Sequence, residues 1–456
     1  MVGLQIARFD DLDVARTALL SRRALEESEL PEAIRARIRE VFGDELSPSL
    51  VVERILADVR SEGDSALARY TEAFDGCAVR ELRVPDQAID AAIRAVPPAV
   101  YAALEAAAEQ VRAFHERARR NTWVDFQGDG ATGQLIRPLA RVGIYAPGGR
   151  VPYPSSVLMA AVPARVAGVR EIVLASPPNR AGEVAPALLA AARIAGVDAV
   201  YRVGGAQAIG ALAFGTESIP RVDKIVGPGN LFVALAKRQV FGYVGIEGLA
   251  GPTECLLVAD ETANPRWLAA DLIAQAEHDP LSQPILLCTS ERQIERTLAA
   301  AAEMLADAPR AEIIRQSLAD RGAVVHVPTV EAGIALANEY APEHLCLCIR
   351  DAWSKVGLVE NAGGVFVGEL SAESIGDYTA GPSHIMPTGG TARFSSPLNL
   401  DDFVKITSVF SFGRTELQRL GPPAIEIAHA EGLHAHAEAI EVRLQELDGQ
   451  GVQDGA

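Results

Sequence analysis

Two short segments of the chain pair a histidine with an oxygen donor. In Gln275-Ala-Glu-His278 the amide and the imidazole stand three residues apart, at the end of a helical pattern that starts at Pro265 and stops at Asp279-Pro280. Side chains three residues apart share one face of a helix, so this pair is suited to hold a metal ion or a polar ligand. The helix dipole alone also explains a histidine at a helix end.

The second segment places a carboxylate directly beside an imidazole. Glu343 and His344 come immediately before the apolar run LCLCI (345–349). Adjacent glutamate and histidine at a junction between a loop and a strand are suited to act as paired proton acceptors on one substrate. The alternative is a surface glutamate beside a partly buried histidine. No HExxH motif occurs in the chain.

A third candidate group is Asp377 and His384, seven residues apart. The stretch 381–399 is rich in glycine and proline and lacks periodicity, which is typical of a functional loop. We expect Asp377 on a loop at a sheet edge, a common place for ligands in open α/β sheets. A turn aspartate that bonds only its own backbone is the alternative.

The last candidates are His429, Glu431, His434 and His436 near the C-terminus. In one continuous helix His429 and His436 would share a face, and Glu431 and His434 would share another. Spacing alone does not select among them, and an incidental surface patch remains possible.

A site built from glutamine, aspartate and two histidines suits Zn²⁺ or Mn²⁺ better than a thiolate zinc cage or a Ca²⁺ loop. The cysteines are odd in number, widely spread and without a CxxC motif. This usage predicts a reduced, cytoplasmic protein with buried free thiols. Cys346 and Cys348 share a strand face, where core packing is a more common role than a metal or redox pair.

The elements that must position these residues alternate between apolar runs and helical patterns. Expected strands are 142–146, 171–175, 198–203, 223–227, 255–259, 285–288, 323–327, 345–349 and 365–367, with helices at 155–167, 184–195 and 206–213 between the first four. This alternation predicts βαβ units and parallel sheets, hence an α/β fold with two sheet blocks. Residues 45–137 and 401–447 read as mostly helical, including one helix over 91–118.

Composition limits the possible partners. The 456 residues carry a net charge of −18, which argues against nucleic acid or an anionic membrane as the main partner. No apolar run reaches the length of about 20 residues that a membrane span needs, and the N-terminus does not resemble a signal peptide.

Dinucleotide binding is not supported by the usual glycine fingerprint. GxGxxG is absent, because Gly227-Pro-Gly229-Asn230 lacks the third glycine, and GxxxxGK[ST] is absent as well. Glycine-rich turns at 147–149, 204–207 and 227–230 each follow an expected strand. Such turns can approach a phosphate closely, or they can be ordinary tight turns.

Taken together and in order, longer segments of the chain closely resemble the histidinol dehydrogenase family. They are VGIYAPGG, GGAQAIGALAFGT, KIVGPGN, AGPTE, QAEHD, APEHL, GDY…GPSH…PTGGTARFSSPL and EGLHAH, over roughly residues 140–440. The resemblance implies a zinc-containing, NAD-dependent homodimer that oxidises L-histidinol through L-histidinaldehyde to L-histidine. It also implies two incomplete Rossmann-like parallel-sheet domains with smaller helical N- and C-terminal segments.

The resemblance also assigns roles to residues. It implies Glu343 and His344 as proton acceptors, and Gln275, His278, Asp377 and His436 as zinc ligands, with His436 and Glu431 donated across the dimer interface. NAD contacts would be Tyr145, Gln207 and Asn230, and substrate contacts would be Thr253, Gln275, His278, His344, Asp377, His384, Glu431 and His436. Thr253 and Ser383 depart from the family's usual serine and asparagine, and His429 and His434 are not implied as ligands.

The expected organisation has five parts. They are a helical arm (1–45), a discontinuous first α/β domain (46–140 with 254–395), a second Rossmann-like domain (141–253), a C-terminal helical segment that reaches the partner subunit (396–447) and a disordered tail (448–456). The main alternative is an NAD-dependent dehydrogenase of another small alcohol, such as a sulfonated diol. A metal-dependent hydrolase and a non-catalytic metal-binding protein are further alternatives.

Overall fold

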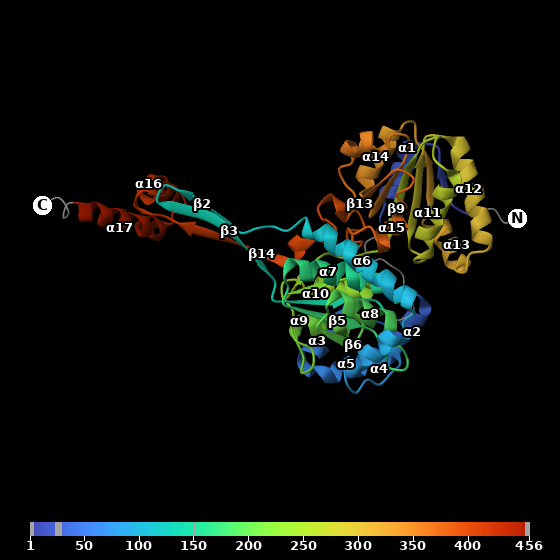
Figure 1. The fold of residues 1–456 in the computed structure, drawn as a ribbon, viewed down its shortest axis with the longest axis horizontal. Helices are drawn as coiled ribbons and strands as arrows, with labels where there is room; N and C mark the ends of the chain where they lie inside the picture. Colours follow the sequence, from blue (N-terminus) through green and yellow to red (C-terminus); the bar gives the residue numbers. More distant parts are fainter. Residues whose placement is uncertain (1–3, 23–29, 149–151, 452–456) are drawn as a thin grey trace. The chain divides into compact units, whose positions relative to one another are not determined.

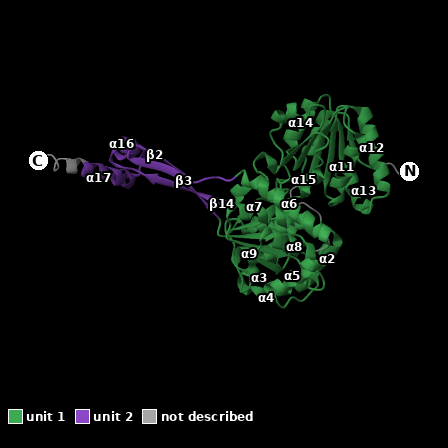
Figure 2. Ribbon diagram, viewed as in Figure 1, with its two compact units in different colours: residues 1–118, 139–403 green, residues 119–138, 404–456 purple. Residues whose placement is uncertain are grey.

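The computed structural model describes residues 4–22, 30–148 and 152–451. The chain forms two compact units (Figure 2). Unit 1 comprises Met1–Ala118 and Leu139–Phe403, and unit 2 comprises Arg119–Pro138 and Val404–Ala456. The candidate residues before position 400 all belong to unit 1, whereas Glu431 and His436 belong to unit 2.

The larger sheet of unit 1, in which Figure 1 labels β9 and β13, has, among the described residues, six parallel strands in the order β1-β11-β10-β9-β12-β13. The strands are β1 (Ala7–Phe9), β9 (Glu254–Ala259), β10 (Gln283–Cys288), β11 (Ala323–His326), β12 (His344–Cys348) and β13 (Gly364–Val367). The chain moves from β9 to β10 on one side, and β12 lies on the other side of β9. The direction of the connections therefore switches between β9 and β12.

Helices cover both faces of this sheet. Helices α1 (Leu12–Leu20) and α14 (Val330–Tyr340) share a core with Leu256 and Val258 of β9. Helices α11 (Pro265–Glu277) and α12 (Glu291–Ala306) share the opposite core with Leu257, and α13 (Ala311–Asp320) packs on α11. Successive residues of β9 thus serve alternate faces, both of them apolar, as expected for a covered parallel sheet. Two short segments, η2 (Ala352–Leu358) and α15 (Glu373–Tyr378), follow β12 and β13.

The second sheet of unit 1 is also parallel, with five strands described in the order β6-β5-β4-β7-β8. The strands are β4 (Arg141–Tyr145), β5 (Glu171–Ser176), β6 (Ala199–Arg202), β7 (Lys224–Val226) and β8 (Gly245–Ile246). Helices α7 (Pro154–Ala167) and α8 (Pro186–Ala195) contribute to one core, and α9 (Gly205–Phe214) and α10 (Leu231–Val240) contribute to the other. The strand order is that of a mononucleotide-binding half, so the expected Rossmann-like α/β class is confirmed.

The helices between positions 32 and 116 pack on the second sheet. They are α2 (Glu32–Phe42), α3 (Pro48–Glu62), α4 (Asp64–Asp75), α5 (Asp86–Ala95) and α6 (Pro98–Glu116). Val52 and Leu67 share a core with Ile209, and Leu104 shares one with Leu158. We expected residues 46–140 to join the first sheet, and the packing differs because helical periodicity does not say which sheet an apolar face covers.

Two further expectations for the N-terminal half are corrected. The arm is not only helical, because β1 extends the first sheet beside β11; residues 1–3 and 23–29 of the arm lie outside the described part. The expected helix over 91–118 is two helices, since α5 ends in extended backbone at Val96 and α6 begins at Pro98. Proline fixes φ at a value suited to a first helical turn, and it disfavours helix at the residue before it.

Unit 2 contains an antiparallel sheet in the order β14-β3-β2, formed by β2 (Trp123–Gln127), β3 (Gly130–Pro138) and β14 (Val404–Ser411). Helices α16 (Arg414–Ala430) and α17 (His434–Gly451) follow. The mostly helical reading of 45–137 and 401–447 is therefore wrong over these strands. The expected disordered tail is wrong over 448–451, which continue α17, and 452–456 lie outside the described residues.

Helices in the described part of the chain are either too short or too polar to cross a bilayer.

Candidate active site

The candidate catalytic, zinc and substrate residues of unit 1 meet at the amino-terminal edge of the six-stranded sheet. Glu254 is the first residue of β9 and His344 the first residue of β12, and these two strands are neighbours. Helix α11 ends near the same edge, because the chain enters β10 soon after Glu277. The predicted junction of loop and strand at Glu343-His344 is confirmed. Ligands of open α/β sheets usually lie at the carboxyl edge. In this sheet the candidate residues lie at the opposite, amino-terminal edge.

The imidazole of His344 is almost fully buried, and its two nitrogens have different surroundings. Nδ1 lies 3.1 Å from the backbone oxygen of Glu254, which can only accept a hydrogen bond. The hydrogen-bond network therefore assigns the proton to Nδ1 and a lone pair to Nε2. Nε2 has no hydrogen-bond partner among the described residues and lies 3.9 Å from Oδ1 of Asp377. An imidazole in this state is ready to accept a proton.

The carboxylate of Glu343 is held by two donors. Its Oε2 accepts hydrogen bonds from Oγ1 of Thr253 at 2.6 Å and from the backbone N–H of Glu254 at 3.0 Å. Burial raises the pKa of Glu343 to about 8, although both hydrogen bonds lower it, and the charge of Asp377 adds to the rise. A carboxylate of this basicity is suited to take a proton from water. Threonine at position 253 thus keeps the hydroxyl that orients Glu343.

Gln275 and His278 lie at the end of α11, as predicted. Gln275 is fully buried, and neither atom of its side-chain amide has a hydrogen-bond partner among the described residues. His278 is the C-cap of the helix, and burial lowers the pKa of its imidazole while the charge of Asp377 opposes that shift. A buried amide without a partner costs about 1–3 kcal/mol, so a ligand for it is expected.

Asp377 lies in the short helix α15 rather than on a loop, which corrects the expectation from the sequence. Position 376 within this helix needs a glycine, because a Cβ there would lie 2.5 Å from the ring of Phe366. The glycine therefore serves close packing and not a turn. Helices α11 and α15 are in contact, which places Asp377 on the same side of the sheet edge as Gln275.

His384 connects the two parallel-sheet layers of unit 1. Its Nδ1 lies 2.7 Å from the backbone oxygen of Asp377, and its Nε2 lies 3.1 Å from Oγ of Ser156 on α7. Burial lowers the pKa of His384, which favours a neutral ring, while Asp377 opposes that shift. Both ring nitrogens are engaged, so the ring is fixed in orientation. The hydroxyl of Ser383 donates to the backbone oxygen of Met159 at 3.3 Å.

The donor set at this edge fits a zinc ion. Gln275, His278 and Asp377 offer an amide oxygen, an imidazole nitrogen and a carboxylate, which are oxygen and nitrogen ligands that Zn²⁺ accepts. The observation that supports the fit is the buried, unpartnered amide of Gln275. Three ligands from one chain leave room for a further ligand and for substrate.

The C-terminal candidates lie in unit 2 and are not on one continuous helix. Helix α16 ends at Ala430, Gly432 has a φ of +74°, and α17 begins at His434. The condition under which His429 and His436 would share a face, one continuous helix, is therefore not met, because the glycine turn reorients the chain. Nδ1 of His429 lies 3.3 Å from Nδ1 of His434, whereas His436 and Glu431 are exposed.

The predicted NAD contacts lie at the carboxyl edge of the five-stranded sheet. Tyr145 ends β4, Gln207 lies in the first turn of α9 after β6, and Asn230 is the N-cap of α10 after β7. The side-chain oxygen of Gln207 is buried without a hydrogen-bond partner among the described residues. Since β4 and β7 flank the switch point of this sheet, these positions match the place where open α/β sheets bind nucleotides.

Glycine at position 227 is required by the turn after β7. Its φ is +113°, and a Cβ there would lie 2.1 Å from the backbone oxygen of Tyr145. The glycine therefore lets this turn pack directly against the backbone at the end of β4. Gly149 in the first glycine-rich turn lies outside the described residues.

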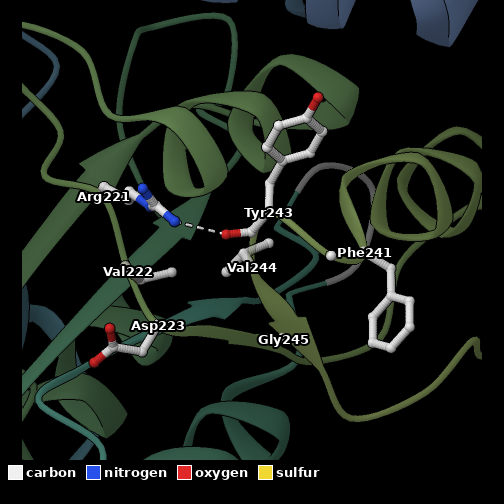
Figure 3. Close-up of a pocket in the computed structure, with 8 residues that line it drawn as sticks. Arg221, Val222, Asp223, Phe241, Tyr243, Val244 and Gly245 are labelled. Atoms are coloured by element: carbon white, nitrogen blue, oxygen red, sulfur yellow. Dashed lines mark hydrogen bonds between the residues drawn. The ribbon is translucent and has the colours of Figure 1, made fainter. Parts of the chain in front are cut away.

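A surface cavity of about 510 Å³ lies at the other end of this sheet, where β7 and β8 begin (Figure 3). The two charged side chains that line it, Arg221 and Asp223, form hydrogen bonds with the backbone. Arg221 donates to the backbone oxygen of Tyr243 at 2.8 Å, and Asp223 accepts from two backbone N–H groups, including that of Arg141. This cavity offers no group for catalysis, and the candidate site stays at the edge described above.

Sequence reasoning missed three charged residues that surround the site. They are Arg22, Glu254 and Glu373. Nη2 of Arg22 lies 3.3 Å from Oε2 of Glu254, and Oε1 of Glu373 lies 3.3 Å from Nδ1 of His344. The available signal for Glu254 was a charged residue at the start of an otherwise apolar strand. Arg22 and Glu373 give no comparable signal, because their partners are distant in sequence.

Comparisons with known proteins agree on one family. The chain matches the family described as histidinol dehydrogenase over residues 43–444. It is 51% identical over 433 residues to the histidinol dehydrogenase of Deinococcus radiodurans, covering 94% of this chain and 98% of that protein. It is 48% identical over 396 residues to that of Halalkalibacterium halodurans, covering 87% and 93%. A crystal structure of histidinol dehydrogenase from Elizabethkingia anophelis is similar with a TM-score of 0.89 at 36% identity, covering 98% of this chain and 99% of that one.

Proposed function

The chain belongs to the histidinol dehydrogenase family, the oxidoreductases of that name in histidine biosynthesis, and on this premise we propose that Glu343 and His344 carry out its proton transfers. The observation that supports this most strongly is the state of His344. Its Nδ1 faces the backbone oxygen of Glu254, and its buried Nε2 has no hydrogen-bond partner among the described residues.

The proposed reaction oxidises L-histidinol in two steps. His344 Nε2 takes the hydroxyl proton while the carbinol carbon loses a hydride, which gives the aldehyde. Glu343 then takes a proton from the water that adds to the aldehyde, while the protonated His344 returns its proton to the carbonyl oxygen. The hydrate then loses a second hydride, and the neutral His344 again takes the hydroxyl proton. NAD⁺ supplies the hydride acceptor when bound, so one histidinol and one water yield histidine and two NADH. General base catalysis of this kind typically contributes about 10²–10⁴ in rate.

Gln275, His278 and Asp377 would hold zinc, with His436 of the partner subunit as the fourth ligand. A bound zinc ion supplies a fixed positive charge that anchors the imidazole and amine of histidinol. Thr253, His384, Glu431 and the zinc ligands are proposed to contact the substrate. Holding the aldehyde at one site keeps it from reacting with amines in solution, and orientation can contribute several kcal/mol.

Removal of the metal should abolish turnover and lower the melting temperature, because the buried amide of Gln275 then lacks a partner. Ligand binding at about 100 times the dissociation constant adds about 2.7 kcal/mol of stability. We would measure zinc content, activity and melting temperature before and after chelation, and again after zinc addition. Full activity in a verified metal-free sample would contradict the proposal.

The proposed NAD site rests on Tyr145, Gln207 and Asn230. A buried ion pair supports its turn, because Nζ of Lys237 lies 2.7 Å from Glu247 and 3.2 Å from the backbone oxygen of Gly227. Glu247 also accepts from the N–H of Gly227 at 2.7 Å. Lys237 and Glu247 thus bind the backbone oxygen and the backbone N–H of Gly227, respectively.

Replacing Lys237 by Met should destabilise the fold by about 3–5 kcal/mol, because Glu247 is left buried and unpaired. The KM for NAD⁺ should rise as the turn at Gly227 loosens. Lys355→Met is a matched control, since Lys355 pairs with Glu331 on the surface and such pairs contribute about 1 kcal/mol or less. Chemical denaturation and NAD⁺ titrations would check both variants, and equal effects would contradict the structural role of Lys237.

The proposed assembly is a homodimer in which Glu431 and His436 complete the partner's site. Unit 2 supports it, because large apolar side chains lie exposed on one face of its small sheet: Trp123 on β2 is 49% exposed and Phe410 on β14 is 70% exposed. A second copy that covers this face would remove the apolar side chains from water. All five cysteines are free and buried, which supports the proposed cytoplasmic location.

The proposed substrate is tested by a panel of alcohols. Incubation with NAD⁺ should give NADH absorbance with L-histidinol and none with a sulfonated diol, which lacks the imidazole and amine. NADH formed from the diol alone would favour the alternative dehydrogenase. Turnover of a hydrolysable substrate without NADH would favour a metal-dependent hydrolase.

A further inference from the structure

We propose that Glu373 is a positioning residue for the base: its carboxylate lies beside Nδ1 of His344 and stabilises the positive charge that the ring gains when Nε2 takes a proton. This inference rests on the proposed function and deepens it. It gives a role to a buried charge that the mechanism above does not use.

The contact is short and shielded from water. Oε1 of Glu373 lies 3.3 Å from Nδ1 of His344, and the two residues are only 5% and 3% exposed. The backbone oxygen of Glu254 lies at a similar distance, 3.1 Å, from the same nitrogen. The carbonyl fixes the tautomer, and the carboxylate, when ionised, places a negative charge on the Nδ1 side of the ring, across from Nε2. In a buried site such a charge acts strongly on an imidazolium.

The one ion-pair partner of Glu373 among the described residues is His344. Oε2 of Glu373 has no hydrogen-bond partner there, and the other polar atoms close by are the thiols of Cys255 and Cys346, within 4.8 Å. Thiols are weak donors. Burial raises the pKa of Glu373 to about 7, and His344 is the group that opposes this rise most.

Helix α15 supplies a carboxylate to each side of the imidazole of His344. Glu373 and Asp377 are four residues apart on it and so share a face. Glu373 approaches Nδ1, whereas Asp377 lies 3.9 Å from Nε2. Gly376 of the same helix packs on Phe366, whose ring centroid lies 5.8 Å from that of His344. The helix thus aligns the base with the proposed zinc ligand.

Glu373→Gln is the direct test, because glutamine keeps the shape and one acceptor oxygen but removes the charge. The kcat for oxidation of both histidinol and histidinaldehyde should fall about 10- to 100-fold, as expected for loss of a buried charged partner of the imidazolium. The KM for histidinol, the zinc content and the melting temperature should stay near wild type. Glu373→Asp keeps the charge at a greater distance and should recover part of the kcat.

Glu369→Gln is the matched control, since Glu369 accepts from the backbone N–H of Asn264 at 2.7 Å and does not approach His344. It should keep wild-type kcat. An unchanged kcat in Glu373→Gln would overturn the proposal. So would a second bound zinc ion that Glu373→Gln removes, because the carboxylate would then serve a metal site with Cys255 and Cys346.

A spectroscopic readout separates this inference from the proposed function. In protein labelled with ¹⁵N-histidine, the Nδ1 proton of His344 should resonate far downfield, disappear in His344→Asn and move upfield in Glu373→Gln. This result does not depend on turnover. An Nδ1 resonance that Glu373→Gln leaves in place would overturn the inference even if histidinol is oxidised, whereas a wild-type protein that forms no NADH would overturn only the proposed function.

Discussion

Replacing His344 by Asn should slow both oxidations by about 10²–10⁴-fold, because the same imidazole takes the proton in each. Asparagine has a similar size and can still donate to the backbone oxygen of Glu254, which His344 contacts at 3.1 Å. The fold and the zinc content should therefore be retained. Rates of NADH formation from histidinol and from histidinaldehyde, measured separately, would check this expectation.

Glu343→Gln should behave differently. Its amide oxygen can still accept from Thr253 and from the backbone of Glu254, so the site should keep its geometry. It cannot take a proton from water, and oxidation of the aldehyde should therefore slow far more than oxidation of the alcohol. Equal losses in both steps would contradict a separate role for Glu343 in hydration.

Two inactive variants should restore activity when their subunits exchange. His344→Ala removes the base in unit 1, and His436→Ala removes the proposed ligand in unit 2. If His436 acts in the partner's site, one site of a mixed dimer contains both wild-type residues, and the other site carries both lesions. Random exchange gives half mixed dimers, so about a quarter of wild-type activity should return.

The alternative arrangement predicts a different outcome. If His436 acted on the site of its own chain, every site in the mixture would keep one lesion, and activity would stay at the level of the separate variants. Subunit exchange must be shown independently, for example with differently tagged chains. Exchange without any recovered activity would rule out the shared site.

The sequence predicts the parts of this site that depend on local pattern. The run LCLCI places His344 at the start of a strand, and Asp279-Pro280 places His278 at the end of a helix. Both positions agree with the structure. The strands of the two parallel sheets were also recognisable, because buried parallel strands are continuous apolar runs. These features need only residues that are close in sequence.

Features that depend on distant contacts were not predictable in this way. Glu254 and Glu343 are linked by hydrogen bonds although about 90 positions separate them, and neither position has a local signal for the other. The strands of unit 2 carry exposed aromatic residues such as Phe126, so their alternation did not indicate a covered face. Gly432 interrupts the C-terminal helices and so changes which histidines share a face.

The central claim is that this chain removes two hydrides from one histidinol at one site. The most direct measurement is the amount of NADH formed per histidinol consumed, with limiting histidinol, excess NAD⁺ and zinc-loaded enzyme. We expect two NADH and one histidine for each histidinol, with no aldehyde released. One NADH per histidinol, with histidinaldehyde accumulating in solution, would contradict the claim.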